Sequence, residues 1–224
     1  MPAFRLSEQP VSVGKYDVFG QESGSVRHFV RHVGLCGEER NGHRANDAVA
    51  LVHMGPPLSR DDGKVQSVGS AGLTVDEINE IGVFVDERSL EYEASRRRDP
   101  KQQYVVHPHA KPVTSADGTV VCTRFSCAGF VIEAYNAVEI LLISDDEDAL
   151  PKSDVEILVN AYPDLERYLR SPARKVVGLE GDGPWPVVLA GYVINSLRRS
   201  MEEIRREPYP PKPGDAYFPA NSNE

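Results

Sequence analysis

One cysteine of this chain has the local sequence of a nucleophile. Cys127 directly follows Ser126, a residue type that commonly caps the N-terminus of a helix. From Cys127 onward, apolar side chains recur at the spacing of a buried helix, at positions 130, 131, 134, 135, 138, 141 and 142. A thiol in the first helical turn lies near unpaired N–H groups and the positive end of the helix dipole, which favour the thiolate. With Arg124 adding positive charge, we expect nucleophilic chemistry at Cys127; the alternative is a small buried hydrophobic side chain.

A cysteine nucleophile also needs a base that carries protons and a polar group that orients the base. All six histidines, at positions 28, 32, 43, 53, 107 and 109, precede Cys127. His28 and His32 are four residues apart in a segment that we predict as helical. We interpret them as a solvated helix face, because no third metal ligand can be placed beside them. The acidic run 145–148 lacks the spacing of a calcium loop, so we expect neither a metal nor a cofactor.

Residues 126–135 also resemble a known family. Their sequence, Ser-Cys-Ala-Gly-Phe-Val-Ile-Glu-Ala-Tyr, is similar to the nucleophile helix of NlpC-type papain-like cysteine peptidases, whose pattern is Asp-Cys-Ser-Gly-Phe-Val followed by an aromatic residue. In that family the catalytic histidine follows the cysteine, whereas here every histidine precedes it. This order resembles the circularly permuted branch, which includes the lecithin retinol acyltransferase-like proteins. In that branch a histidine strand, a polar third residue and the cysteine helix follow one another.

The resemblance implies that the buried strand 47–55 carries the catalytic histidine at its start. Asp47 occupies that position, with Asn46 before it. We therefore predict His43, four residues before Asp47, as the base. His53, at the far end of the strand, is interpreted as a packed or rim residue.

The next predicted strand, 64–69, is matched to the strand that supplies the orienting group. Gln66 is the residue assigned to that role, with an ordinary strand glutamine as the alternative. The oxyanion hole would come from the backbone N–H of Cys127 and its neighbours. The implied reaction is hydrolysis or acyl transfer on an amide or ester through a Cys127 thioester, with a peptide or small acyl compound as substrate.

Two other interpretations remain open. Because Asp47 replaces the strand-start histidine, the chain could be a non-catalytic member of the fold that binds a ligand or a partner. It could also be an unrelated α+β protein in which the cysteine motif occurs by chance.

The elements that must position these residues follow from apolar periodicity and turn residues. We predict strands at 16–19, 47–55, 64–69, 82–86, 104–107 and 175–179. We predict helices at 25–36, 73–81, 89–98, 127–142, 153–162, 164–170 and 187–206, a polar loop at 38–46 and an extended tail at 208–214. The class is α+β, and the resemblance implies a papain-like, circularly permuted NlpC-type fold. In it a small antiparallel sheet or barrel packs on the cysteine-bearing helix.

Length indicates one domain, or one domain with an appendage. We assign 1–150 to the papain-like domain and 151–224 to a C-terminal helical extension and Pro-rich tail, packed on the first part and available for an oligomer interface. With 25 basic and 34 acidic residues, the net charge of −9 argues against a nucleic-acid partner. The sequence contains no apolar run long enough for a membrane span. Three cysteines without a signal-peptide pattern favour a cytoplasmic location.

Overall fold

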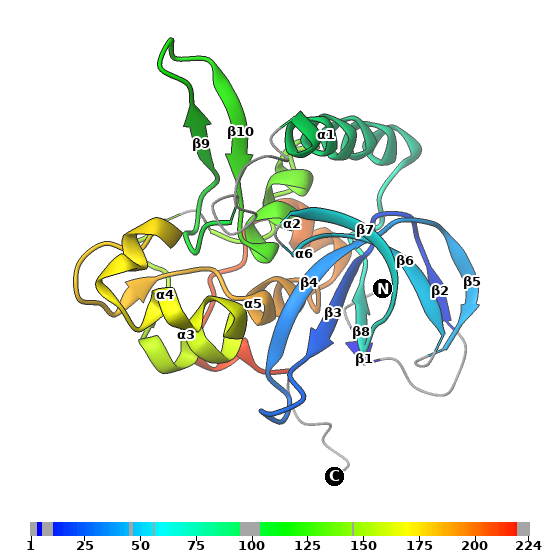
Figure 1. Ribbon diagram of the computed structural model, residues 1–224. Helices are drawn as coiled ribbons and strands as arrows, with labels where there is room; N and C mark the ends of the chain where they lie inside the picture. The colour runs from blue at the N-terminus through cyan, green and yellow to red at the C-terminus, as the bar shows by residue number, and fades with distance from the viewer. Residues whose placement is uncertain are drawn as a thin grey trace.

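The central feature of the fold is an antiparallel sheet of six strands (Figure 1). The structure, a computed structural model, describes residues 4–5, 11–44, 47–55, 57–94, 104–144 and 146–218. The strand order is β1 (Phe4–Arg5), β8 (Ser67–Gly69), β3 (Val18–Glu22), β4 (Val30–Cys36), β6 (Ala48–Met54) and β7 (Leu58–Lys64). A separate pair joins β2 (Val11–Val13) to β5 (Arg40–His43). The chain is therefore a mixed α+β protein with an antiparallel sheet, which confirms the predicted class.

Strand β4 lies at the centre of this sheet, and it shows that the predicted helix 25–36 is wrong. Residues 33–36 are all buried, because both faces of β4 are covered. Val33 and Leu35 belong to the large hydrophobic cluster on the helical face, whereas Cys36 packs in a second cluster with Phe19 and Leu51. A strand buried on both faces loses its polar–apolar alternation, so its periodicity does not distinguish it from a helix.

Helices α2 (Cys127–Asn136) and α5 (Ala190–Ser196) cover one face of the sheet by packing against β4 (Figure 1). The predicted start of α2 is confirmed, since the Ser126 hydroxyl accepts a hydrogen bond from the Gly129 N–H at 2.9 Å. The helix ends at Asn136, earlier than the apolar stripe predicts. Ile140, Leu142 and Ile143 are buried in the non-helical segment that follows. Their apolar side chains therefore extended the helical pattern in the sequence beyond the end of the helix.

Helix α1 (Val75–Ala94) is continuous, so the predicted strand 82–86 is wrong. Its buried residues, Ile81, Val85 and Tyr92, follow helical spacing. The apolar run that suggested a strand includes Val83, which is exposed on the outer face of the helix. The rest of the predicted helix 89–98, beyond residue 94, lies outside the described residues.

The remaining elements surround this core. They are β9 (Lys111–Thr114) and β10 (Val120–Arg124), β11 (Lys152–Ser153) and β12 (Trp185–Pro186), α3 (Val155–Ala161), α4 (Glu166–Leu169), α6 (Met201–Arg206), and 3-10 turns at Pro163–Leu165, Pro172–Val177 and Pro213–Ala216. The predicted strands 104–107 and 175–179 are wrong: the first makes only a single bridge, and the second falls largely on a 3-10 turn. The predicted helix 187–206 is two helices, because a Ser200–Glu203 capping box starts α6.

Other predictions agree with the structure in whole or in part. Strand β6 confirms the predicted strand 47–55, and α3 and α4 confirm the helical segments 153–162 and 164–170. The predicted strand 64–69 is divided between the end of β7 and β8, and the predicted loop 38–46 contains β5.

One hydrophobic cluster extends across both predicted parts of the chain. It includes Val33 and Phe130 from the first part and Leu158 and Val193 from the second, so the proposed boundary at 150 crosses a continuous core. In the described part of the chain, no helix combines the length and the apolar character that crossing a membrane requires.

Gly34 of β4 is expected to be intolerant of a side chain. A Cβ at this position would lie 2.6 Å from the Cβ of His53 and 2.6 Å from the Phe19 ring. Because this contact is tighter than packing allows, Gly34→Ala should lower the free energy of unfolding by about 1–3 kcal/mol in urea titrations. Gly24→Ala, where no atom lies within 4 Å of the new Cβ, is the matched control. Equal stability of the two variants would contradict this packing.

Candidate functional site

A cavity of about 600 Å³ opens where the start of α2 meets β4 and β6. Cys127 and Tyr104 line it from one side, and His32 and His53 line it from the sheet. The outer walls come from Arg31 and from the segment 161–165, which joins α3 to the following 3-10 turn. The cavity therefore brings the predicted nucleophile together with two histidines that the sequence did not assign to a site.

Cys127 is held tightly at the base of this cavity. Only 1% of the residue is exposed, and its backbone N–H donates to the Tyr104 hydroxyl at 2.9 Å. Burial raises the pKa of the Cys127 thiol, and hydrogen bonds from the Tyr104 hydroxyl and the Val33 N–H offset only part of that effect. The helix start was expected to favour the thiolate, but desolvation outweighs it here. In the resting structure Cys127 is therefore a neutral thiol.

Arg124 acts on Tyr104 rather than on the sulfur. Its guanidinium donates to the backbone carbonyls of Tyr104 and Val176. Arg124, which was expected to place positive charge beside the nucleophile, therefore stabilises the segment that carries the Tyr104 hydroxyl.

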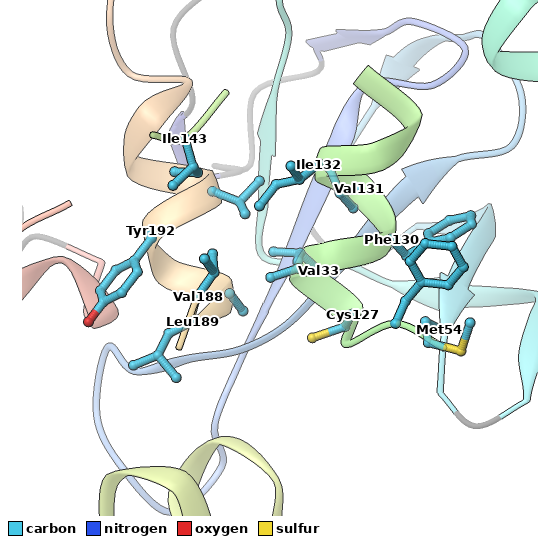
Figure 2. Close-up of a cluster of buried hydrophobic side chains, with 14 of the residues drawn as sticks. Val33, Met54, Cys127, Phe130, Val131, Ile132, Ile143, Val188, Leu189 and Tyr192 are labelled. Atoms are coloured by element: carbon cyan, nitrogen blue, oxygen red, sulfur yellow. The ribbon is translucent and has the colours of Figure 1, made fainter. Parts of the chain in front are cut away.

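The sheet opens beside Cys127. Backbone pairing between β4 and β6 is present at Leu35–Val52 and Cys36–Leu51 and does not continue toward the start of β4. There α2 packs against β4, and the nearby Val33 N–H lowers the pKa of the Cys127 thiol in part. Figure 2 shows Cys127 in the first turn of α2, with Val33 and Met54 nearby. The thiol thus lies beside β4 where its backbone pairing with β6 has ended.

Three side chains form a hydrogen-bonded series on neighbouring strands. His32 Nε2 of β4 lies 2.9 Å from His53 Nδ1 of β6. His53 Nε2 lies 3.2 Å from each carboxylate oxygen of Asp61 on β7. The imidazole rings of His32 and His53 meet edge to face, with their centroids 4.8 Å apart. These contacts bridge β4 and β6 where their backbone pairing has ended.

The carboxylate fixes the protons along this series. Because the Asp61 carboxylate only accepts hydrogen bonds, His53 donates from Nε2 and its Nδ1 is an acceptor. His32 then donates from Nε2 to His53, which leaves His32 Nδ1 with a free lone pair. Burial is the largest cause that lowers the pKa of His32, to about 3. His32 is therefore a neutral imidazole with one basic nitrogen.

The structure separates the two residues predicted as base and orienter from Cys127. His43 ends β5 and is buried, and neither of its ring nitrogens has a hydrogen-bond partner among the described residues. Gln66 is exposed, and its side-chain oxygen accepts from the Glu22 N–H at 3.0 Å. Neither residue lines the cavity around Cys127.

Sequence reasoning missed His32, Asp61 and Tyr104, and it interpreted His53 as a rim residue. The error at His32 follows from the helical interpretation of 25–36. As a strand, the segment Val30-Arg31-His32-Val33 would have placed a polar pair between apolar residues beside the predicted strand 47–55. Nothing in the local sequence indicates that Tyr104 contacts Cys127, because 23 residues separate them.

Searches of protein-family models, curated proteins and solved structures gave no match to this chain.

The thiol of Cys127 should titrate above the ~8.5 of a free cysteine, because burial raises its pKa. Iodoacetamide labelling from pH 6 to pH 10, quantified for each cysteine peptide by mass spectrometry, measures this value. Tyr104→Phe removes a hydroxyl that stabilises the thiolate and should raise the apparent pKa further. Rapid labelling at neutral pH with an apparent pKa below 8.5 would show that the sulfur is not desolvated as described.

His32 should make the fold sensitive to mild acid. Its pKa is about 3 in the folded chain and near 6.5 when unfolded, so below pH 6.5 only the unfolded state takes up its proton. The free energy of unfolding should therefore fall as the pH decreases from 6.5 toward 4, at up to ~1.4 kcal/mol per pH unit from this group. Urea titrations of His32→Gln should show a shallower acid slope than the original protein. Identical slopes would exclude a buried neutral His32.

Proposed function

We propose that this chain is a cysteine hydrolase or acyltransferase that acts on an amide or ester through a thioester on Cys127. The observation that carries the proposal is the cavity lined by Cys127, His32 and His53, with Asp61 hydrogen-bonded to His53 outside the cavity lining. A nucleophile, a neutral base with a free lone pair, and groups that orient the base are the three parts that such chemistry requires.

In the proposed acylation step the thiol and the base act together. The substrate carbonyl carbon is attacked by the Cys127 sulfur as the thiol proton passes to Nδ1 of His32. No hydrogen bond joins these two groups in the described structure, so substrate entry must bring them into reach. His53 and Asp61 stabilise the imidazolium that forms, since His32 Nε2 already donates to His53. Collapse of the tetrahedral intermediate returns the proton to the departing amine or alcohol and leaves the acyl group on sulfur.

The second step regenerates the thiol. His32 removes a proton from water, for hydrolysis, or from an acceptor alcohol or amine, for acyl transfer. The oxygen of water or the alcohol, or the nitrogen of the amine, attacks the thioester carbonyl carbon. The carbon–sulfur bond breaks, and the sulfur recovers its proton from His32. The neutral resting pair suits this general-base route, because neither group has to hold a buried charge before the substrate arrives.

Tyr104 is placed to assist with the developing oxyanion. Its hydroxyl and the N–H of Cys127 are 2.9 Å apart and bonded to each other in the resting structure. A substrate carbonyl oxygen that displaced the hydroxyl as acceptor would receive the Cys127 N–H and the Tyr104 O–H together. This arrangement extends the predicted oxyanion hole, which contained backbone N–H groups alone.

The order of these residues is consistent with a circularly permuted papain-like fold. His32, His53 and Cys127 follow the permuted order of histidine strand, polar residue and cysteine helix, and α2 packs on the antiparallel sheet that carries both histidines. In this proposal His32 and His53 take the roles predicted for His43 and Gln66. The position of Asp47 is then no obstacle, since the base lies on β4 rather than at the start of β6.

A ligand-binding module is the second candidate function. It is favoured by the 1% exposure of Cys127 and by the raised pKa of its thiol, both of which are typical of a chemically inert cysteine. In that case the same cavity would hold a small ligand between the imidazole pair and the apolar side chains of Met54, Pro163 and Leu165.

Hydrolysis of p-nitrophenyl acetate, together with mass spectrometry of the intact protein, tests the enzyme directly. We expect an acetyl group on Cys127 early in the reaction and loss of turnover in Cys127→Ala. His32→Gln should lower kcat by about 10²–10⁴-fold, the usual contribution of a general base. His43→Gln is the matched control and should retain the original rate, because His43 lies outside the cavity.

Two results would contradict the proposal. If ester turnover survives Cys127→Ala, the activity does not arise from this cysteine. If His43→Gln loses activity while His32→Gln keeps it, the assignment of the base is wrong. Absence of any acyl-enzyme with several activated esters would favour the binding module.

A further inference from the structure

A second cavity, of about 640 Å³, lies away from Cys127, between the end of α5 and the C-terminal segment. Arg198 and Arg199 line it from the end of α5, and Arg27 and His28 line it from the residues before β4. The remaining wall comes from Asn195, Tyr209, Gly214, Asp215, Tyr217 and Phe218. The proposed hydrolase site uses none of these residues.

This cavity concentrates positive charge in an acidic protein. Three arginines and a histidine line it against one carboxylate, Asp215, although the whole chain carries a net charge of −9. The Asp215 carboxylate is already occupied, since its Oδ2 accepts from the Tyr209 hydroxyl and the Lys212 N–H, each at 2.7 Å. The local field therefore favours an anion.

Among the described residues Arg199 forms no ion pair, although the charges of Glu203 and Glu207 partly offset the effect of burial on its pKa. Its Nε donates to the Ser196 carbonyl at 3.0 Å and its Nη1 to the Glu207 carbonyl at 2.7 Å. Its Nη2 is buried and has no hydrogen-bond partner among the described residues. An unpaired buried cationic donor is costly, and a bound anion that is absent from the structure is one established reason for such a group.

Arg198 is exposed at the same cavity and forms no ion pair within the described structure. Its guanidinium carbon lies 5.9 Å from the centre of the Phe218 ring. Arg199 is similarly placed over Tyr209, at 5.4 Å. The aromatic rings restrict both guanidinium groups while leaving Arg198 free to donate to a ligand.

The cavity wall is formed before any ligand binds. The Asn195 side-chain amide donates to the carbonyls of Gly191, Asp215 and Tyr217, at 3.0, 2.8 and 3.2 Å. The Phe218 N–H donates to the His28 carbonyl at 2.6 Å. These bonds fix the C-terminal segment against α5 and against the residues before β4, so binding would require little ordering of the wall.

We propose that this second cavity binds the phosphate group of a small phosphorylated molecule. The planar fork of a guanidinium matches the geometry of phosphate oxygens, and the site offers two such groups on consecutive residues. The volume lies within the usual range for small-molecule sites and exceeds that of a bare oxyanion. Tyr217, which is 41% exposed, and Phe218 provide an aromatic surface for the organic part of the ligand.

Titration calorimetry with phenyl phosphate and with inorganic phosphate tests this site. We expect saturable binding of both, tighter for phenyl phosphate, and weakened by added salt because the contacts are ionic. Arg198→Ala should raise the Kd about tenfold or more, the effect of losing one charge-assisted hydrogen bond, and Arg198→Glu should raise it further. Arg199→Ala also removes two bonds to backbone carbonyls, so the test depends on Arg198.

Arg31→Ala is the matched control, because Arg31 is an exposed arginine that lines the other cavity. Unchanged affinity in this variant, with weakened affinity in Arg198→Ala, supports the proposal. Loss of binding in Arg31→Ala but not in Arg198→Ala would place the anion in the Cys127 cavity and overturn it. It would also be overturned if phenyl phosphate failed to bind at millimolar concentration, or if a phosphate-free acidic peptide bound as tightly.

Discussion

The packing of the first turn of α2 against β4 is the contact on which the rest of the structure depends. Here Cys127 lies beside Val33, at the point where the backbone ladder between β4 and β6 has ended. Val33, Cys127 and Phe130 are buried in one hydrophobic cluster, and this burial stabilises the contact between the helix and the strand. The same opening lets the side chains of His32 and His53 bridge the two strands. The cavity therefore results from a strand pair that is closed by side chains instead of backbone bonds.

This arrangement has an electrostatic cost that shapes the chemistry. A buried thiol and a buried imidazole both favour their neutral forms, which is why the pKa of Cys127 is raised and that of His32 is lowered. The ion pair typical of many cysteine enzymes is thus disfavoured at rest. Asp61, exposed on β7, supplies the negative charge that would stabilise the imidazolium during reaction, while its own solvation limits the cost to the fold.

The C-terminal segment also contacts the chain at the start of this strand. Tyr217 bridges to Phe29, and the Phe218 N–H bonds to the His28 carbonyl, directly before β4. Gly191 of α5 allows the C-terminal segment to pack closely against the helix. A Cβ at Gly191 would lie 2.4 Å from the Ala216 carbonyl oxygen, so the two backbones pack directly against each other. Residues assigned from the sequence to an extension therefore help to hold the strand that carries His32. The proposed phosphate site includes residues directly before β4, the proposed hydrolase site includes residues of β4, and the two share no side chain.

The sequence by itself determined the features that depend on neighbouring residues. The N-cap at Ser126, the start of α2, the strand β6 and the α+β class all follow from local chemistry and short-range periodicity. The tertiary structure decided which distant side chains meet. A central strand that is covered on both faces does not alternate between polar and apolar residues. The sequence of β4 was therefore interpreted as a helix, and His32 was assigned to its solvated face. His53 and Asp61 belong with His32 only through the order of β4, β6 and β7 in the sheet, and no local pattern encodes that order. The state of Cys127 was decided in the same way, since its helix position favours a thiolate, whereas the burial imposed by β4 and Tyr104 favours the thiol.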